Sequence, residues 1–481
     1  MNTKDIKSVY FVGAGGIGMS AIARFFIKKG LVVAGYDKTP SNLTRQLERE
    51  GMLIHYEENV NDIPFVCKEK DSCLVVYTPA IPENHKELQY FRENGFEIQK
   101  RAQVLGTLTR QHKGLCVAGT HGKTTTSTMC AHILHQSHLD CNAFLGGISK
   151  NYGTNYILSD SDFVVIEADE FDRSFHWLSP YMTVITSTDP DHLDIYGTHE
   201  KMLEAYAQFA NQTNPEGTLF LKEGIFRTLD GEEFIEYGHE HHHHDDHPHT
   251  HTFTHPHIHT YTAHGIEADY YAINVRTYNG NLFFDLRTPD GVLYDLELDG
   301  TALFNVENAV VASAVALSCG LDQYQLRSGL KTFAGVRRRF DYRIREKELV
   351  YIDDYAHHPK EIQSTIESVR YLYPGKRVVG IFQPHLYSRT RDLADDFARV
   401  LGTLDELIMM PIYPAREMPI AGVTSSMVLR KVDSMSKYLC TPDQVLELVP
   451  ALCPDVVLTL GAGDIDRLVP RLEATLREQL L

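Results

Sequence analysis

The sequence predicts an α/β protein of three domains, each built on a mostly parallel sheet. The chain has 481 residues, 43% of them hydrophobic, which at about 150 residues per domain is enough for roughly three cores. Short apolar runs alternate with helical patterns, as in the strand–helix–strand units that form parallel sheets. This alternation restarts at residues 114–119 and 349–355, so we expect a new domain to begin near each point.

The predicted domains are 1–108, 109–335 and 336–481. The first opens with a strand over 8–13 and a helix over 20–30. A strand over 31–37 completes the unit. The last domain holds a full alternating set, expected as a helix over 360–371, a strand over 377–383, a helix over 388–401, strands over 406–413 and 456–463, and a final helix through Leu480.

Composition and charge exclude several classes of protein. The net charge of −18 argues against broad binding to nucleic acid or to anionic membranes, because both need a basic surface. No signal peptide is recognisable, and no apolar run approaches the ~18 residues of a membrane span. The eight cysteines are scattered singly, as expected for reduced, buried thiols. We therefore expect a cytoplasmic protein, either a monomer or a weak homodimer.

A glycine-rich loop lies between the first expected strand and helix. Its glycines, Gly13, Gly15, Gly16 and Gly18, would let the backbone approach a pyrophosphate at a helix N-terminus. Asp37 ends the next strand, where dinucleotide-binding folds place a ribose-binding carboxylate. The pattern fits NAD(P), but a UDP-sugar also carries a pyrophosphate and a ribose.

A second loop has the context of a nucleoside-triphosphate site. It follows a strand over 115–118 and precedes a helix over 127–136. Lys123 would reach the β- and γ-phosphates, and the Thr124 hydroxyl could bind Mg²⁺. Val117 replaces the first glycine of the long form of this motif. The residues predicted to bind ATP here are Gly119, Thr120, His121, Gly122, Lys123, Thr124 and Thr125.

Acidic residues follow two further expected strands. One run holds Glu167, Asp169, Glu170 and Asp172, and the other holds Asp189, Asp191, His192 and Asp194. Carboxylates and an imidazole at strand ends beside a phosphate loop are suitable ligands for Mg²⁺.

The last domain carries three polar clusters. Two of them come straight after expected strands, at the carboxyl edge where open parallel sheets bind ligands. The clusters hold Arg337, Arg338 and Arg339; Asp353, Asp354, Tyr355, His357 and His358; and His385, Tyr387, Arg389 and Arg391. We expect at least two of the three to line the site.

Residues 239–264 contain twelve of the 25 histidines of the chain. One interpretation is transition-metal binding, since closely spaced imidazoles can form a chelating pair. The other is a solvated surface insertion in the middle domain, which we favour because nothing here fixes one coordination geometry.

Together these motifs resemble the Mur ligase family of peptidoglycan synthesis. The matching stretches run in family order and cover nearly the whole chain: GAGGIGMSAIA, GTHGKTTT, EADEFD, DPDHLDIYG, NVENA, GVRRRFDYR, DDYAHHPKEI, FQPHLYSRT, IYPAREMPIAGVTS and LGAGDI. The resemblance implies an N-terminal Rossmann-like domain that binds a UDP substrate, a central P-loop ATPase-type domain and a C-terminal Rossmann-like domain. It is strongest to members that use ATP and Mg²⁺ to join L-alanine to UDP-N-acetylmuramate through an acyl phosphate.

The resemblance also implies roles for individual residues. The Mg²⁺ ligands would be Thr124, Glu167 and His192. Further ATP contacts would come from Asn305, Arg339 and Asp354. The muramyl carboxylate and the alanine would be surrounded by Tyr355, His357, His385 and Arg389. The residues on which catalysis would depend are Lys123, His192, Arg339, His357, His385 and Arg389.

Some positions depart from the family pattern. Phe304, Ser187, Phe171 and Leu386 stand where histidine, asparagine, serine and, in some members, arginine are common. Three alternatives stay open: a recycling ligase that adds a peptide to UDP-N-acetylmuramate, an NAD(P)-dependent oxidoreductase built on the first glycine loop, and a metal-storage or sensing protein built on residues 239–264.

Overall fold

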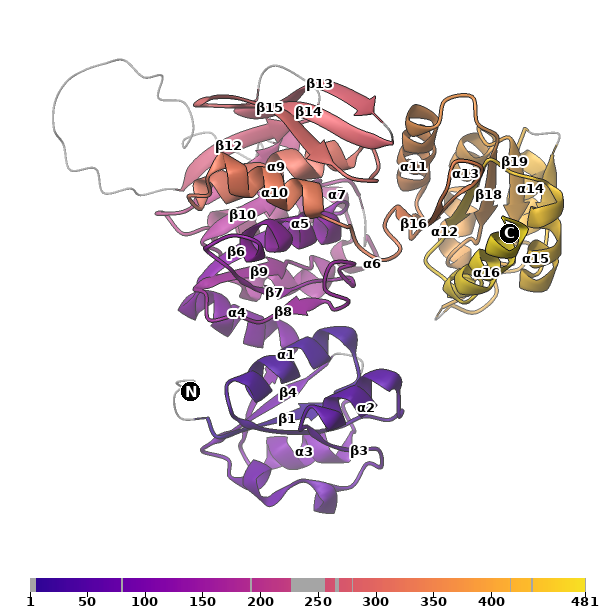
Figure 1. The fold of residues 1–481 in the computed structure, drawn as a ribbon. Coiled ribbons are helices and arrows are strands. Elements are labelled where there is room, and N and C mark those ends of the chain that lie inside the picture. The colour runs from indigo at the N-terminus through magenta and orange to yellow at the C-terminus, as the bar shows by residue number, and fades with distance from the viewer. Residues whose placement is uncertain are drawn as a thin grey trace, which may run out of the picture. The chain divides into compact units, whose positions relative to one another are not determined.

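The computed structural model contains three β-sheets (Figure 1). It describes residues 6–78, 81–190, 193–225, 256–263, 268–278, 280–415, 417–433 and 436–480. The chain divides into two compact units. Unit 1 comprises Met1–Tyr271, Leu286–Leu293 and Asn308–Gly329, and unit 2 comprises Ala272–Asp285, Tyr294–Glu307 and Leu330–Leu481.

The first sheet has five parallel strands in the order β3-β2-β1-β4-β5, an order typical of dinucleotide-binding folds. Side chains of β1 alternate between two cores: Val9 and Phe11 pack with α1, and Tyr10 packs with Phe91 of α3. Burial on both faces explains the continuous apolar run. The elements are β1 (Ser8–Val12), α1 (Ile17–Lys28), β2 (Val32–Tyr36), α2 (Asn42–Arg49), β3 (Leu53–His55), β4 (Cys73–Tyr77), α3 (Lys86–Glu93), β5 (Glu97–Lys100) and α4 (Arg101–Gln111).

The second sheet has ten strands in the order β15-β14-β13-β12-β11-β10-β6-β9-β7-β8. Strand β6 lies between β10 and β9 and is parallel to both, so their carboxyl ends meet at one edge. The strands are β6 (Lys113–Ala118), β7 (Asn142–Phe144), β8 (Tyr156–Ile157), β9 (Phe163–Glu167), β10 (Met182–Ile185), β11 (Thr218–Lys222), β12 (His257–Thr262), β13 (Tyr270–Tyr278), β14 (Asn281–Thr288) and β15 (Gly291–Leu298). The helices are α5 (Lys123–His135), α6 (Leu193–Tyr196), α7 (His199–Asn211), α9 (Asn305–Ser318) and α10 (Gln323–Thr332).

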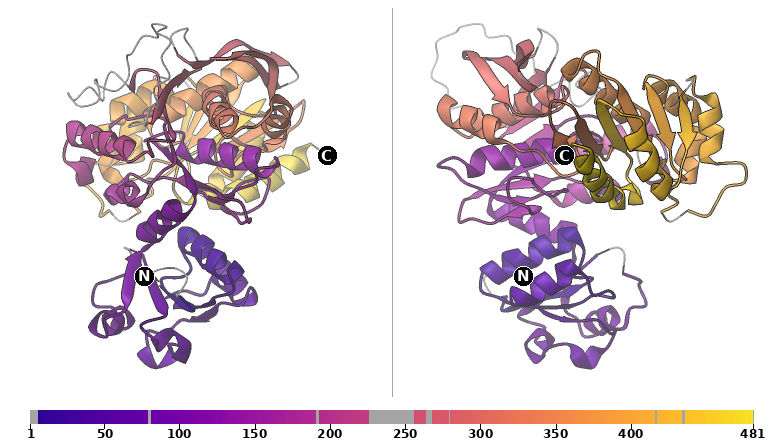
Figure 2. Two further views of the ribbon diagram at one scale, coloured as in Figure 1. Left: turned by 90° about the vertical axis from the view of Figure 1, so that its left-hand side faces the viewer. Right: turned by 45° about the vertical axis from the view of Figure 1, so that its right-hand side comes forward.

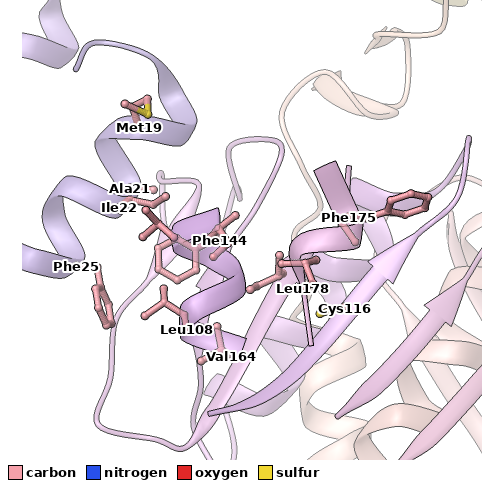
Figure 3. Packing of buried hydrophobic residues seen from close by; sticks show 14 of the residues in the cluster. Met19, Ala21, Ile22, Phe25, Leu108, Cys116, Phe144, Val164, Phe175 and Leu178 are labelled. Atoms are coloured by element: carbon pink, nitrogen blue, oxygen red, sulfur yellow. The ribbon is translucent and has the colours of Figure 1, made fainter. Parts of the chain in front are cut away.

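One hydrophobic cluster in unit 1 links the first two sheets (Figure 3). Phe25 of α1 and Phe144 of β7 meet edge to face with ring centroids 6.0 Å apart. Leu108 of α4 and Val164 of β9 belong to the same cluster. Each fully buried side chain of this size contributes about 1.5–3 kcal/mol, so the cluster holds the two glycine loops on one framework.

The third sheet has six strands in the order β16-β17-β21-β18-β19-β20, of which β16 is antiparallel. Helices cover both of its faces (Figure 2). Val379 and Ile381 pack with α15 and α16 on one face, and Phe382 meets Phe397 of α13 on the other. The elements are β16 (Asp341–Arg345), β17 (Val350–Asp354), α11 (Pro359–Leu372), β18 (Val378–Phe382), α12 (Tyr387–Asp392), α13 (Ala394–Leu401), β19 (Glu406–Met409), α14 (Ser425–Lys431), β20 (Lys437–Leu439), α15 (Pro442–Ala451), β21 (Val456–Leu460) and α16 (Val469–Gln479).

Several sequence-based expectations need correction. The helix expected over 388–401 is two helices, because Leu393 between them has non-helical backbone angles (φ −112°, ψ 19°). The helix after the second glycine loop begins at Lys123 rather than at residue 127. Strand β20 and helices α14 and α15 were not predicted. The described ranges contain no helix with the length and apolarity of a membrane span, and all eight cysteines are free thiols.

The prediction of a surface insertion over residues 239–264 is wrong for the last part of this histidine-rich segment. Its last part forms β12, which pairs with β11 inside the second sheet. Tyr261 of this strand is buried, and its hydroxyl donates to the carbonyl of Ile185 at 3.2 Å. Residues 257–262 are therefore a strand of the second sheet with a buried end at Tyr261 and Thr262, and not part of a surface insertion. Residues 239–255 and His264 lie outside the described residues.

Candidate active site

The second glycine loop joins β6 to α5 by a tight turn that only glycine can form. Gly119 and Gly122 have φ of +133° and +82°, in the region that side chains disfavour. A Cβ atom on Gly119 would lie 2.1 Å from Oγ1 of Thr186. The loop therefore lies directly on the end of β10.

Hydroxyl groups at the end of β10 support this loop. The Ser187 hydroxyl accepts from the His121 N–H at 2.8 Å and shares a hydrogen bond of 2.7 Å with the Thr120 hydroxyl. Thr186 Oγ1 donates to the Ala118 carbonyl at 3.0 Å. The sequence identified Ser187 only as a departure from the family pattern, and the contacts by which it supports the loop became visible only in the structure.

Lys123 is the first residue of α5 and points back over the loop. Its Nζ donates to the Gly119 carbonyl at 2.6 Å and to Oε1 of Glu170 at 2.7 Å. Burial by itself lowers the pKa of Lys123, but Glu170, Glu167 and Asp169 outweigh it and raise that pKa. Burial raises the pKa of Glu170, and Lys123 opposes this shift. The ammonium group thus stays charged and pairs with Glu170, which the sequence indicated only as one of several possible Mg²⁺ ligands and not as a partner of Lys123.

Thr124 and Glu167 form a pair of oxygen ligands beside Lys123. Thr124 Oγ1 donates to Oε1 of Glu167 at 3.0 Å, and the Gly146 N–H donates to Oε2 at 2.9 Å. A hydroxyl and a carboxylate fit Mg²⁺, which prefers hard oxygen ligands and keeps several waters. Within the described ranges, no three histidine, cysteine or acidic side chains group as a metal site. The predicted ligand His192 lies outside those ranges.

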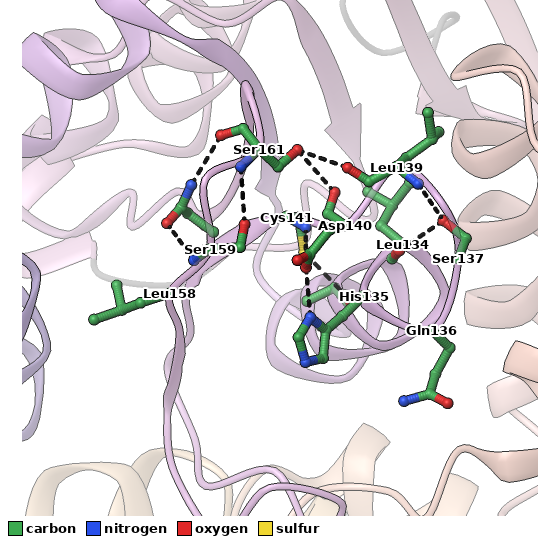
Figure 4. A network of polar contacts seen from close by, with 12 residues as sticks. Leu134, His135, Gln136, Ser137, Leu139, Asp140, Cys141, Leu158, Ser159 and Ser161 are labelled. Carbon is green, nitrogen blue, oxygen red and sulfur yellow. Dashed lines mark hydrogen bonds and ion pairs between the residues drawn. The ribbon is translucent and has the colours of Figure 1, made fainter. Parts of the chain in front are cut away.

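Polar contacts anchor the far end of α5 (Figure 4). Ser161 Oγ donates to the carbonyls of Leu139 and Asp140 at 2.8 and 3.0 Å. Asp140 Oδ1 accepts from the Cys141 N–H at 2.7 Å and lies 2.5 Å from Nδ1 of His135. Since α5 is held at both ends, the direction of Lys123 is set by the framework.

The first glycine loop is tied to Asp37. The Gly15 N–H donates to Oδ2 of Asp37 at 2.6 Å, and the Thr39 N–H donates to Oδ1 at 3.0 Å. A Cβ atom on Gly15 would lie 2.8 Å from Oδ2. In this structure Asp37 shapes the loop, so its predicted contact with a ribose stays a prediction. Gly13 has φ of +90°, and Gly16 precedes α1 directly.

The three polar clusters of the last domain come together within unit 2. The Tyr355 ring contacts the guanidinium groups of Arg338 and Arg339 at 5.2 and 4.9 Å. The rings of His357 and His385 lie 5.9 Å apart, and those of Tyr355 and His357 lie 5.3 Å apart. The structure therefore brings residues from all three clusters close together, and their lining of the substrate site stays a prediction.

Two imidazoles of this cluster, those of His357 and His385, have lowered pKa values. Burial, His357 and Arg389 lower the pKa of His385 to about 4. Burial also lowers the pKa of His357, despite the nearby Glu361. The His385 ring stacks on Tyr413, with centroids 5.8 Å apart. Tyr413 was not predicted as a site residue, because only the fold brings it here.

Leu386 lies at the turn that leads into α12, and Arg391 lies near the end of that helix. Leu386 has φ of +70°, which is unusual for a branched side chain, and its N–H donates to the Tyr413 carbonyl at 3.0 Å. This conformation turns the chain between His385 and α12. Arg391 is exposed and pairs with its neighbour Asp392, so it does not join the histidine cluster.

Two buried polar residues predicted to contact ATP also lie in unit 2. Asp354 accepts from the Thr365 hydroxyl at 2.7 Å and from the Ala356 N–H at 3.2 Å. Burial raises the pKa of Asp354 to about 6. Asn305 begins α9, and its Nδ2 donates to Oγ1 of Thr301 at 2.6 Å.

Comparison with known proteins decides the family. Models of three domains match in order: "Mur ligase family, catalytic domain" over 8–113, "Mur ligase middle domain" over 117–316, and "Mur ligase, glutamate ligase domain" over 338–463. The chain belongs to the Mur ligase family. The predicted family and the three-domain, mostly parallel α/β fold are thereby confirmed. The structure places the glycine loops of this Mur ligase on two sheets of unit 1.

Relatives of this Mur ligase match over almost its full length. UDP-N-acetylmuramate–L-alanine ligase of Parabacteroides distasonis is 53% identical over 482 residues, covering 100% of this chain and 99% of the relative. The enzyme of the same name from Porphyromonas gingivalis W83 is 49% identical and covers 96% and 98%. The crystal structure of UDP-N-acetylmuramate-alanine ligase from Thermotoga maritima is 25% identical, with a TM-score of 0.75 and coverage of 98% and 99%.

Proposed function

We propose that this Mur ligase uses ATP to join L-alanine to the carboxylate of UDP-N-acetylmuramate in peptidoglycan precursor synthesis. The single observation that carries the proposal is the geometry around Lys123, where a strained glycine turn, a buried ammonium group and a Thr124–Glu167 oxygen pair meet at one sheet edge. Relatives about half identical over the whole chain carry the name of this activity, which favours it over peptide recycling and hydride transfer.

The chemistry explains why ATP is needed. A carboxylate is a poor electrophile, because attack by an amine would have to expel oxide. In the proposed reaction a carboxylate oxygen attacks the γ-phosphorus and ADP leaves, which gives an acyl phosphate. The alanine amine then attacks the acyl carbon, the amine loses a proton, and the tetrahedral intermediate expels phosphate. Catalysis therefore depends mainly on positioning and charge neutralisation.

We assign the binding roles as follows. Lys123 neutralises the ATP phosphates, with the loop residues Gly119, Thr120, His121, Gly122, Thr124 and Thr125. Further ATP contacts come from Asn305, Arg339 and Asp354. The UDP part is held by Gly13, Gly15, Gly16, Gly18 and Asp37. The muramyl carboxylate and alanine are held by Tyr355, His357, His385 and Arg389.

We propose Mg²⁺ as the metal ion, which would neutralise phosphate charge. Thr124 and Glu167 would hold it, and His192 remains the third proposed ligand. We also propose that the domains divide near residues 108 and 335. The substrates are nucleotide-linked, which favours a cytoplasmic enzyme, acting as a monomer or weak homodimer.

Phosphate release with each substrate omitted in turn tests the proposal. The complete mixture of ATP, Mg²⁺, UDP-N-acetylmuramate and L-alanine should release phosphate continuously, and omitting any one component should abolish steady release. Turnover with an L-alanine-initiated tripeptide but not with L-alanine would establish the recycling activity instead. Binding of NAD(P)H together with a complete lack of ATP consumption would favour the oxidoreductase.

A further inference from the structure

Arg101 lies against the first glycine loop, although its sequence position did not single it out. It is the first residue of α4. A Cβ atom built on Gly18 would lie 2.5 Å from Nε, 2.6 Å from Cζ and 3.0 Å from Nη2 of Arg101. Gly18 is not among the glycines with positive φ. The backbone conformation does not require glycine here, but a side chain at this position would displace the guanidinium group.

The guanidinium group has an unused hydrogen-bond donor. Its Nε is buried and has no hydrogen-bond partner among the described residues. A buried donor without a partner is unfavourable, because it has lost its hydrogen bonds to water, and a ligand that supplies an acceptor would remove this cost. Burial lowers the pKa of Arg101, and Asp169 and Glu167 oppose this, which leaves the group charged at neutral pH.

The surroundings indicate what the acceptor is. Gly18 lies in the first turn of α1, a helix of 12 residues. The free N–H groups and dipole of a helix N-terminus favour an anion. A partly buried cation whose Nε is buried and unused, beside such a terminus, forms a site for a group that carries charge on several oxygens.

We propose that Arg101 contacts the diphosphate of the UDP-linked substrate and so positions it on the first glycine loop. This inference rests on the proposed function. An anionic oxygen could also come from the carboxylate of the sugar, but Gly18 belongs to the glycine loop, which favours the diphosphate.

Calorimetric binding without ATP or alanine tests the inference. The ligands are uridine, UDP, UDP-N-acetylglucosamine and UDP-N-acetylmuramate. Arg101→Ala should lower the affinity for the three ligands that carry a diphosphate by roughly 10- to 150-fold, as expected for the loss of a charged hydrogen bond. The affinity for uridine should not change. Arg101→Lys should recover part of the loss. Arg110→Ala, on the exposed side of the same helix, should bind all four ligands like the wild type.

A second variant separates contact from structural support. Gly18→Ala should displace the guanidinium group and so lower the affinity for the same three ligands. In the double variant with Arg101→Ala, the loss of binding free energy should be much smaller than the sum of the losses in the two single variants. In steady-state assays Arg101→Ala should raise the KM for UDP-N-acetylmuramate and leave the KM for ATP unchanged.

The outcomes that overturn the inference are distinct from failure of the proposed function. A loss confined to UDP-N-acetylmuramate would assign Arg101 to the carboxylate instead, and equal affinities for wild type and Arg101→Ala would remove the contact altogether. A wild-type protein that binds no UDP-N-acetylmuramate would overturn the proposed function itself.

Discussion

At the scale of single residues, charge pairing decides how the site is held. Lys123 is 15% exposed and Glu170 only 1%, so their 2.7 Å contact is a buried ion pair. Such a pair adds little net stability, but removing one partner leaves a buried charge and costs about 3–5 kcal/mol. Lys123 therefore matters for folding as well as for the role proposed for it in the reaction.

Replacing Lys123 separates these roles. Lys123→Ala should lower turnover by at least about 100-fold, since it removes charge stabilisation in the transition state, and should also lower the Tm by several degrees. Adding Glu170→Gln should restore most of the Tm without restoring activity. Thermal melts and phosphate release on both variants provide the check. Near-normal turnover of Lys123→Ala would contradict the proposed role.

The buried carboxyl of Asp354 predicts a pH-dependent stability. Its folded pKa of about 6 lies above the ordinary value of 3.8, so between these values the folded protein binds more protons than the unfolded one. Stability must then fall as pH rises through this window. Asp354→Asn should remove that penalty and stabilise the unliganded protein at pH 8 by up to roughly 3 kcal/mol, given about two pKa units.

Melting curves from pH 4 to pH 8 measure this effect. The gain from Asp354→Asn should become small near pH 4, where the folded carboxyl is protonated and the unfolded one, with a pKa of 3.8, is already partly protonated. Asp396→Asn, at an exposed ion pair, is the matched control and should show no such trend. A gain that is constant with pH would mean that Asp354 titrates normally.

At the scale of elements, the strand β12 limits what can be removed from the histidine-rich segment. β11 and β12 are parallel, so the chain after Lys222 must return along the sheet before His257. The connection must therefore span one strand length, which is about 17 Å for five residues. After deletion of 239–254 about 18 residues would remain between the two strands, and an extended segment of that length reaches over 50 Å.

Two deletions test this reading. Removal of 239–254 should leave turnover within about twofold and the Tm within a few degrees, because the strand pairing can still form. Removal of 239–264 deletes β12 with its buried Tyr261, and should cause loss of cooperative unfolding. Circular dichroism melts and phosphate release compare them. Loss of ligation in the shorter deletion would give the histidines a role in the reaction.

At the scale of the whole molecule, an acidic protein must bind anionic substrates. The net charge is −18, and cations such as Lys123, Arg101 and Arg339 supply local positive charge. Salt screens interactions beyond the Debye length, about 10 Å at 0.1 M. Added salt therefore weakens the long-range repulsion between the acidic protein and an anionic substrate more than it weakens the short contacts of the substrate with these cations.

Raising NaCl from about 20 to 150 mM should therefore change the affinity for UDP-N-acetylmuramate by less than about threefold, or tighten it. Calorimetric titrations at constant pH measure this. A steep loss of affinity with salt, as for basic proteins that bind polyanions, would show that long-range attraction dominates.

The sequence predicted the fold more completely than it predicted the contacts within the site. The loop around Lys123 was predicted because a glycine turn between a strand and a helix is encoded within a few residues. Glu170 lies 47 residues after its partner Lys123, and Ser187 lies 67 residues after its partner Thr120. No local sequence pattern could therefore identify either residue as a hydrogen-bond partner of the loop. The roles of the predicted residues remain proposals.

The amino-acid order alone determined the family, the alternating elements and the two glycine loops, because local backbone geometry and hydrophobic alternation are written in neighbouring residues. Tertiary structure decided that residues 257–262 form a strand of the second sheet, that Lys123 pairs with Glu170, and that Arg101 lies against Gly18. These depend on contacts between distant segments, and their energies exist only once the intervening chain has folded.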